Sequence, residues 1–322
     1  MRQIVAADIG GTHARFAIAT LDGKSVACLG DAVTLRTSEH ASFETAWEEF
    51  QRRSGGALPH QLAMAVAGPV GGETLQLTNN PWAIRPAMLR DKLAKGGLTI
   101  VNDFGAVGYA VAALGGDSFQ SICGPDRPLP DAGVITILGP GTGLGVAALL
   151  RRGGDYDVIE SEGGHIDFAA LDSLEDRMLV HLRSNFRRVS VERLISGRGL
   201  MNIYEALGAI EGHALDIRDD QSLWAAALDG TDSLAAAALD RFCLCLGAVA
   251  GDLALVHGAS AVVIGGGGGL RLAGHLPKSG FPSRFTAKGR FERRMADIPV
   301  KLITYPQPGL FGAAAAFAHD HD

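Results

Sequence analysis

The chain has 322 residues, of which 47% are hydrophobic, so it can bury a large core and is expected to divide into two domains. Its formal net charge is −6, and no basic run gives the electrostatic footprint of a protein that binds nucleic acid or an anionic membrane. The start of the sequence lacks the pattern of a signal peptide, and no apolar stretch is expected to approach the roughly 20 residues of a membrane-spanning helix. These features predict a soluble cytoplasmic protein whose partner is a small molecule.

The four cysteines, Cys28, Cys123, Cys243 and Cys245, do not make a disulfide framework in a chain of this length and are expected to be reduced thiols. Cys243 and Cys245 could instead form half of a zinc site. They fall in an apolar stretch of helical character, residues 239–256, where a spacing of two directs side chains about 200° apart. A structural role is therefore favoured over a metal site.

The first residues predict a strand, a glycine turn and a second strand. Residues 3–7 form the first strand and end at Asp8-Ile9-Gly10-Gly11-Thr12, after which residues 13–19 alternate with a period of two. The same arrangement recurs over residues 134–150, around a glycine-rich turn at 139–145. This repetition suggests two related α/β lobes that face one another, with a ligand in the cleft between them.

The remaining predicted elements fill two lobes of different character. Helices are predicted at residues 42–53, 86–95, 171–187, 190–207, 232–257 and 312–318. Strands are predicted at residues 61–67, 98–101, 261–264 and 300–303, with a strand pair at 156–168. The five consecutive glycines 265–269 are interpreted as a third glycine turn after a strand. The second lobe is therefore expected to be the larger and more helical of the two.

The glycine turns can bring backbone N–H groups close to phosphate oxygens, because a residue without a Cβ permits positive φ and close approach. None of them matches the P-loop, and neither of the first two matches the dinucleotide-binding fingerprint. The Asp8 carboxylate would repel phosphate unless a cation lay between them, which suggests Mg²⁺ held largely through water. A hairpin turn with a capping Asp8 is the alternative. The recurrence of the turn, with Thr12 and Thr142 as hydrogen-bond donors, favours phosphate binding.

Asn102 and Asp103 follow the predicted strand 98–101 and so fall at the carboxyl end of a strand, the usual rim of an α/β cleft. A carboxylate there suits a general base that accepts a proton from a hydroxyl group. The alternative is that Asp103 caps a helix that begins near Gly105. From these residues alone the two interpretations are equally favoured.

The segment Glu160-Ser161-Glu162-Gly163-Gly164-His165-Ile166-Asp167 places carboxylates and an imidazole around a pair of glycines. The glycines allow a sharp turn that would bring Glu162 and His165 together, and such groups can hold the vicinal hydroxyls of a sugar. Chelation of a metal by His165 and Asp167 is the competing interpretation. Further along, Ser190 and Glu192 have the pattern of a helix start, with a capping hydroxyl and an acid in the first turn.

Seven motifs, taken together and in this order, make the chain resemble the bacterial glucokinase family over essentially its full length. The motifs are Asp8-Ile9-Gly10-Gly11-Thr12, Thr78-Asn79-Asn80-Pro81-Trp82, Asn102-Asp103-Phe104, Gly139-Pro140-Gly141-Thr142-Gly143-Leu144-Gly145, Glu162-Gly163-Gly164-His165-Ile166-Asp167-Phe168, Glu192-Arg193-Leu194-Ile195-Ser196-Gly197 and Pro308-Gly309-Leu310-Phe311-Gly312. The resemblance implies a two-lobed actin-like ATPase fold of the ribonuclease H-like type. A small α/β lobe would comprise residues 1–113 and 303–322, and a larger α+β lobe residues 114–302.

The same resemblance implies a role for each site residue. Asp103 would be the general base that activates the 6-hydroxyl of glucose, while the other hydroxyls would be held by Asn102, Glu162, His165 and Glu192. The phosphates of MgATP would be bound by Asp8, Ile9, Gly10, Gly11 and Thr12 of the first turn and by Gly139, Gly141, Thr142 and Gly143 of the second, with Asp8 holding Mg²⁺ through water. The third turn, with Gly266 and Gly267, would lie against adenosine. Family members are usually cytoplasmic homodimers.

Several residues depart from the family pattern. His13 stands where Asn commonly follows Gly-Gly-Thr, Pro140 replaces a small residue and removes one N–H donor, and Asn80-Pro81 replaces a more polar pair. An enzyme with another acceptor, such as mannose, fructose or an N-acetylated hexosamine, is the main alternative. A sugar-sensing regulator is disfavoured, because the first turn begins at residue 8 and the cysteine-rich zinc loop of the related repressor and kinase family is absent.

Overall fold

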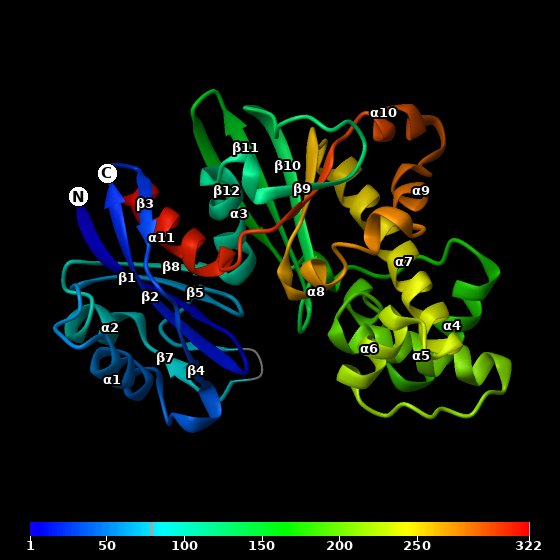
Figure 1. The fold of residues 1–322 in the computed structure, drawn as a ribbon, viewed down its shortest axis with the longest axis horizontal. Helices are drawn as coiled ribbons and strands as arrows, with labels where there is room; N and C mark the ends of the chain where they lie inside the picture. Colours follow the sequence, from blue (N-terminus) through cyan, green and yellow to red (C-terminus); the bar gives the residue numbers. More distant parts are fainter. Residues whose placement is uncertain (78–79, 322) are drawn as a thin grey trace. The chain divides into compact units, whose positions relative to one another are not determined.

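The computed structural model describes residues 1–77 and 80–321, so Thr78 and Asn79 of the motif before Trp82 lie outside the described residues, as does Asp322. The contacts divide the chain into two compact units. The first unit comprises Met1–Gly115 and Tyr305–Asp322, and the second comprises Gly116–Thr304. Each unit contains a six-stranded mixed sheet with helices, so the expected α/β class is confirmed (Figure 1).

The sheet of the first unit has the order β3-β2-β1-β5-β8, and β4 also pairs with β2. Its strands are β1 (Arg2–Ile9), β2 (His13–Asp22), β3 (Ser25–Leu29), β4 (Val33–Arg36), β5 (Gln61–Val66) and β8 (Gly97–Asn102). β1 and β2 are antiparallel, whereas β5 and β8 continue the sheet in parallel. In this register Ile9 pairs with Val66 and Val66 with Asn102. The first glycine turn and the Asn102-Asp103 pair therefore lie at the same edge of one sheet.

Both faces of this sheet are buried, because successive side chains of β1 point to opposite faces and all of Ile4–Ala7 are apolar and buried. The helices of the unit are α1 (Phe43–Ser54), α2 (Pro86–Lys92), α3 (Asp103–Ala113) and α11 (Pro308–Asp320), and its short elements are the 3₁₀ turn η1 (Thr37–Glu39) and the pair β6 (Leu75–Gln76) and β7 (Ala83–Ile84). One face packs against α1 through Phe16, Phe43 and Phe50. The other face is covered by the alanine-rich α11, drawn in red over the blue strands in Figure 1.

The C-terminal helix α11 packs on its partner helix α3 at very close range. A Cβ on Gly312 would collide with the carbonyl oxygen of Ala106, so only glycine allows this approach. The helix also contacts β1, β2, β3, β5 and β8. The helix α11 thus belongs to the first unit and packs on the sheet that contains β1.

The sheet of the second unit has the order β12-β11-β10-β13-β14-β9. Its strands are β9 (Phe119–Cys123), β10 (Ala132–Pro140), β11 (Leu144–Arg152), β12 (Asp155–Ser161), β13 (Ala261–Ile264) and β14 (Val300–Ile303). The antiparallel run β12-β11-β10 followed by the parallel β13 and β14 repeats the strand directions of β3-β2-β1-β5-β8. The two glycine turns occupy the same place in this pattern, one between β1 and β2 and the other between β10 and β11.

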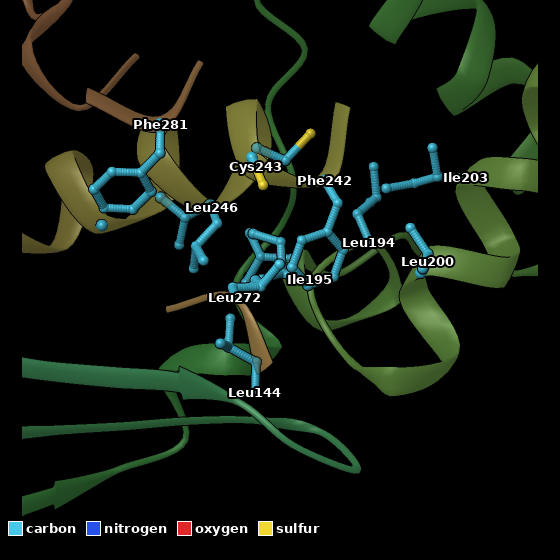
Figure 2. Packing of buried hydrophobic residues seen from close by; sticks show 14 of the residues in the cluster. Leu144, Leu194, Ile195, Leu200, Ile203, Phe242, Cys243, Leu246, Leu272 and Phe281 are labelled. Atoms are coloured by element: carbon cyan, nitrogen blue, oxygen red, sulfur yellow. The ribbon is translucent and has the colours of Figure 1, made fainter. Parts of the chain in front are cut away.

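The second unit is rich in helices, as expected. They are α4 (Ser173–Asn185), α5 (Gly197–Glu211), α6 (Asp220–Asp229), α7 (Ser233–His257), α8 (Gly266–Arg271), α9 (Phe281–Thr286) and α10 (Glu292–Ala296). The central helix is α7, from which Phe242, Cys243 and Leu246 pack among side chains of the neighbouring segments (Figure 2). Cys243 and Cys245 are both buried, and burial raises the pKa of the Cys243 thiol to about 12 and that of Cys245 further.

By length and composition alone, α7 could cross a membrane. It has 25 residues, and an 18-residue window within it has a mean hydropathy of 1.6. The expectation that no apolar stretch approaches this length was therefore wrong. Within the protein, 72% of that window is buried. Its apolar character is accounted for by its place in the core of the second unit.

Three further expectations about the second unit were wrong. Residues 190–207 are not one helix, because the 3₁₀ turn η4 (Val191–Arg193) is separated from α5 by a break at which Ser196, not Ser190, caps the helix through Gly199 N. The strand pair at 156–168 is one strand, β12, followed by the 3₁₀ turn η3 (Gly163–His165). The glycines 265–269 do not form a separate turn, because Gly265 is the N-cap of α8 and Gly266–Gly269 are its first residues.

Candidate active site

The first glycine turn is held by hydrogen bonds to three successive carbonyl groups. Gly10 O accepts from Asn80 Nδ2 at 3.0 Å, Gly11 O accepts from Thr37 Oγ1 at 2.8 Å, and Thr12 O accepts from Thr37 N at 3.0 Å. In a planar trans peptide the N–H points away from the preceding carbonyl. The N–H groups of Gly11 and Thr12 therefore point away from the carbonyls that Asn80 and Thr37 hold. Backbone N–H groups that a turn directs to one side can bind an anion, and these two are candidates for that role.

Asp8 lies beside this turn and pairs with Arg15 of β2, with 3.2 Å between Oδ2 and Nη1. Burial raises the pKa of Asp8 above its ordinary value, and the nearby Arg15 guanidinium acts in the opposite direction. A Cβ on Gly309, at the start of α11, would come within 2.9 Å of the Asp8 carboxylate. The Arg15 guanidinium thus supplies one cation beside Asp8, and this ion pair was not predicted from the sequence.

Within residues 1–77 and 80–321, no group of three or more His, Cys, Asp and Glu side chains is arranged to hold a metal ion. A single carboxylate at Asp8 fits Mg²⁺ only in the mode in which the ion keeps most of its waters and takes its other ligands from phosphate. The residues present are compatible with that mode.

At the end of β8, Asn102 caps α3. Its Oδ1 accepts hydrogen bonds from Phe104 N at 2.9 Å and Gly105 N at 3.4 Å, and its Nδ2 donates to Gly68 O at 3.2 Å. The alternative in which Asp103 is the N-cap was therefore wrong. Asp103 is the first residue of α3, and its Oδ1 accepts from Phe104 N at 2.9 Å. Its carboxylate is partly exposed at the amino end of the helix, which is compatible with a general base.

The second glycine turn is closed by a hydrogen bond from Gly141 N to Gly143 O at 2.8 Å and anchored by one from Gly197 N to Gly141 O at 2.8 Å. The glycine run packs directly against this turn. A Cβ on Gly139 would collide with Gly265 O, and a Cβ on Gly268 would lie 2.6 Å from Pro140 O. A Cβ on Gly266 would likewise lie 2.8 Å from Pro140 O, so close approach explains glycine at positions 139, 266 and 268. A Cβ on Gly267, in contrast, would meet nothing within 4 Å.

Glu162 and His165 face each other across η3, with 3.9 Å between Oε2 and Nε2 and with more than half of each side chain exposed. This is the convergence expected from the glycine pair, because residues three apart eclipse in a 3₁₀ turn. Asp167 turns instead to Arg188, whose Nε donates to its Oδ1. The geometry thus disfavours the chelating pair of His165 and Asp167.

Glu192 lies in η4 and its Oε2 accepts a hydrogen bond from Leu144 N at 2.9 Å. It is therefore not an acid in the first turn of a helix 190–207, and it contacts the end of the second glycine turn. In the second unit the structure brings Glu192 together with the turn Gly139–Gly143. Glu162 and His165 lie on the adjoining segment, which packs against Leu144, since a Cβ on Gly164 would collide with Leu144 O.

Two residues in contact with the first unit's site were not anticipated. Thr37 and Arg15 lie 26 and seven residues from their partners in sequence, and neither belongs to a recognisable motif. Arg15 carried a weak signal, since it is a charged residue directly before the apolar run Phe16–Ala19. Thr37 carried none.

Comparison with known proteins gives consistent matches. The family model described as Glucokinase matches residues 5–320. A glucokinase of Zymomonas mobilis subsp. mobilis is 63% identical over 319 residues, covering 99% of this chain and 98% of that protein, and one of Paramagnetospirillum magneticum is 39% identical over 317 residues, covering 97% of each. Among solved structures, a glucokinase from an Antarctic psychrotroph has a TM-score of 0.85 and 33% identity, covering 98% of each chain.

A glucokinase of the ROK family from Streptomyces griseus, solved with glucose and AMPPNP, has a TM-score of 0.61 and covers 97% of this chain and 98% of that one. At 17% identity this second structure shows a common fold alone.

Proposed function

We propose, from the premise that this chain belongs to the glucokinase family, that it transfers the γ-phosphoryl group of ATP to the 6-hydroxyl of glucose. The family model matches residues 5–320, and this range includes every residue of the proposed site. The chain is a hexose kinase by this membership. The observation that best supports the assignment within the structure is that the first glycine turn and Asn102-Asp103 share one edge of a single sheet.

In the proposed reaction the protein contributes positioning and charge stabilisation, because phosphoryl transfer asks for little covalent chemistry from the enzyme. Asp103 acts as the general base and accepts the proton of the 6-hydroxyl as that oxygen attacks the γ-phosphorus. Asn102 is held by its bonds to α3 and Gly68, so its position is fixed before the sugar arrives. Glu162, His165 and Glu192 of the second unit hold the other hydroxyls.

We further propose that backbone N–H groups of both glycine turns bind the phosphates of ATP, with Asp8 holding Mg²⁺ through water. The ion would supply charge neutralisation on the phosphate oxygens. Gly266 and Gly267 at the start of α8 are proposed to lie against adenosine, and Gly267 offers open space for such a contact. Residues 1–113 with 303–322, and residues 114–302, remain the proposed functional lobes of an actin-like ATPase. A cytoplasmic homodimer is proposed for the assembly.

The experiment that tests this function is ADP production with a panel of hexoses and a control without sugar. Glucose is expected to give the highest kcat/KM, and ADP production without sugar is expected to be a small fraction of that rate, because a site completed by sugar suppresses transfer to water. A higher kcat/KM for mannose, fructose or N-acetylglucosamine would transfer the assignment to that acceptor. ADP production that does not depend on any sugar would refute the kinase assignment.

A further inference from the structure

Glu192 holds the backbone of the second glycine turn. Its Oε2 accepts from the N–H of Leu144, the residue that directly follows the turn, at 2.9 Å and across 48 residues of sequence. An acceptor that carries a full charge makes a hydrogen bond roughly twice as strong as a neutral one. This bond therefore fixes the orientation of the peptide group between Gly143 and Leu144.

The space around this bond is filled on both sides. A Cβ on Gly143 would collide with Glu192 Oε2, and a Cβ on Gly164 would collide with the carbonyl oxygen of Leu144. The side chain of Leu144 is 5% exposed and points into the core beside Ile195 and Leu272 (Figure 2). The segments that carry Glu192 and Glu162–His165 thus enclose the backbone of Leu144.

The segment that follows Glu192 is itself anchored to the core of the unit. Asn202, which is 5% exposed, donates from Nδ2 to Arg193 O at 2.7 Å, and Trp224 Nε1 donates to Gly197 O at 3.3 Å. Gly197 N in turn donates to Gly141 O at 2.8 Å. The turn is therefore bound at both Gly141 and Leu144 to one short and well-supported segment.

The two oxygens of the Glu192 carboxylate differ in their surroundings. Oε2 is bonded to Leu144 N, whereas Oε1 has no hydrogen-bond partner among the residues that the structure describes. A carboxylate can accept several hydrogen bonds at once. One oxygen can therefore hold the turn while the other accepts from a hydroxyl group.

We infer that Glu192 is a positioning residue for nucleotide as well as a ligand for sugar: its carboxylate orients the second glycine turn through Leu144 N. This inference rests on the proposed function for its two ligands. It predicts that nucleotide affinity depends on Glu192 even when no sugar is present. Glu162, which belongs to the same proposed sugar set, makes no bond to the turn and lacks this second role.

The test compares Glu192→Ala and Glu192→Gln, with Glu162→Ala as the matched control. Dissociation constants are measured by titration calorimetry for ADP and AMPPNP without sugar, and for glucose without nucleotide. In Glu192→Gln the amide oxygen can still accept from Leu144 N, so nucleotide affinity is expected to stay within about twofold of wild type. In Glu192→Ala the acceptor is lost, and nucleotide affinity is expected to fall about tenfold, or about 1.4 kcal/mol. Glu162→Ala is expected to weaken glucose binding alone.

Nucleotide affinity equal to wild type in Glu192→Ala would overturn the inference, as would an equal loss in Glu192→Gln or Glu162→Ala. Absence of nucleotide binding in the wild-type chain would overturn it too. If Glu192→Ala fails to fold by circular dichroism, Gly143→Ala replaces it, since its Cβ would displace the carboxylate and is expected to weaken nucleotide binding likewise. Failure of the proposed function appears separately, as a lack of glucose-dependent ADP production while nucleotide binding retains this pattern.

Discussion

Thr37 offers a sharp test of how the first glycine turn is held. Its side chain is buried, at 3% exposure, and its hydroxyl donates to Gly11 O at 2.8 Å. Thr37→Val keeps the shape and the backbone bond from Thr37 N to Thr12 O, and removes only the hydroxyl donor. A neutral hydrogen bond contributes about 0.5–1.5 kcal/mol, which corresponds to about a twofold to tenfold change in an equilibrium constant.

The expected result follows from what the turn binds. KM for ATP should rise about twofold to tenfold in Thr37→Val, while KM for glucose should stay at the wild-type value. The free energy of unfolding should fall by a similar amount, measured by urea denaturation. Thr37→Ser retains the hydroxyl and serves as the control, with KM for ATP near wild type. If the valine variant matches wild type in both KM for ATP and unfolding, the turn is not held in the way described.

Four further predictions follow from features described above. Asp103→Asn should retain glucose binding and lose about 10² to 10⁴ in kcat, and near-normal turnover in a coupled assay would remove this residue from the mechanism. Because burial raises the pKa of Asp8 in the folded state, the ionised carboxylate destabilises the fold at a pH above that pKa. Asp8→Asn should therefore raise the melting temperature at pH 7. This gain should shrink as the pH falls towards about 4, because the carboxyl group is then protonated in the wild-type protein too. A gain that grew on acidification would contradict this sign. Gly312→Ala should destabilise the fold by about 1–3 kcal/mol in urea, since the added methyl meets a backbone carbonyl of α3, and an unchanged midpoint would contradict the packing. In the native protein at pH 8 a thiol reagent should label the exposed Cys28 rapidly and Cys243 only on unfolding; rapid labelling of both would contradict the burial.

The elements that the sequence predicted well are those in which local pattern and tertiary packing agree. The helix expected from residue 42 begins there because Ser42 caps α1 through Thr45 N, and Thr45 returns the bond in a capping box. β1 and β10 were recognisable because an apolar run ends at a glycine turn in each case. The place of Asn102 at the carboxyl end of a strand was also predicted, whereas the parallel register that aligns it through Val66 with Ile9 was not.

The failures arose where long-range contacts decide the local conformation. Residues 190–193 have the local pattern of a helix start. However, Glu192 accepts a hydrogen bond from Leu144 N, and the helix begins only after its N-cap Ser196. The glycine run was interpreted as a turn because glycine permits one, whereas here it serves close packing against Pro140. Thr37 was missed for the same reason, because its partner lies 26 residues away.

The position of α11 has a consequence for synthesis of the protein on the ribosome. Residues 116–304 form a contiguous unit, so all of its strands and helices have been made before residues 305–322 are added. The first unit has no such independence, because one face of its sheet is covered by Leu310, Ala313 and Phe317, which are synthesised after the whole second unit. The apolar alanines of that face stay open to solvent or to chaperones until α11 has been synthesised. Nascent chains halted before residue 308 should therefore resist protease in the internal unit and be cleaved in the N-terminal one.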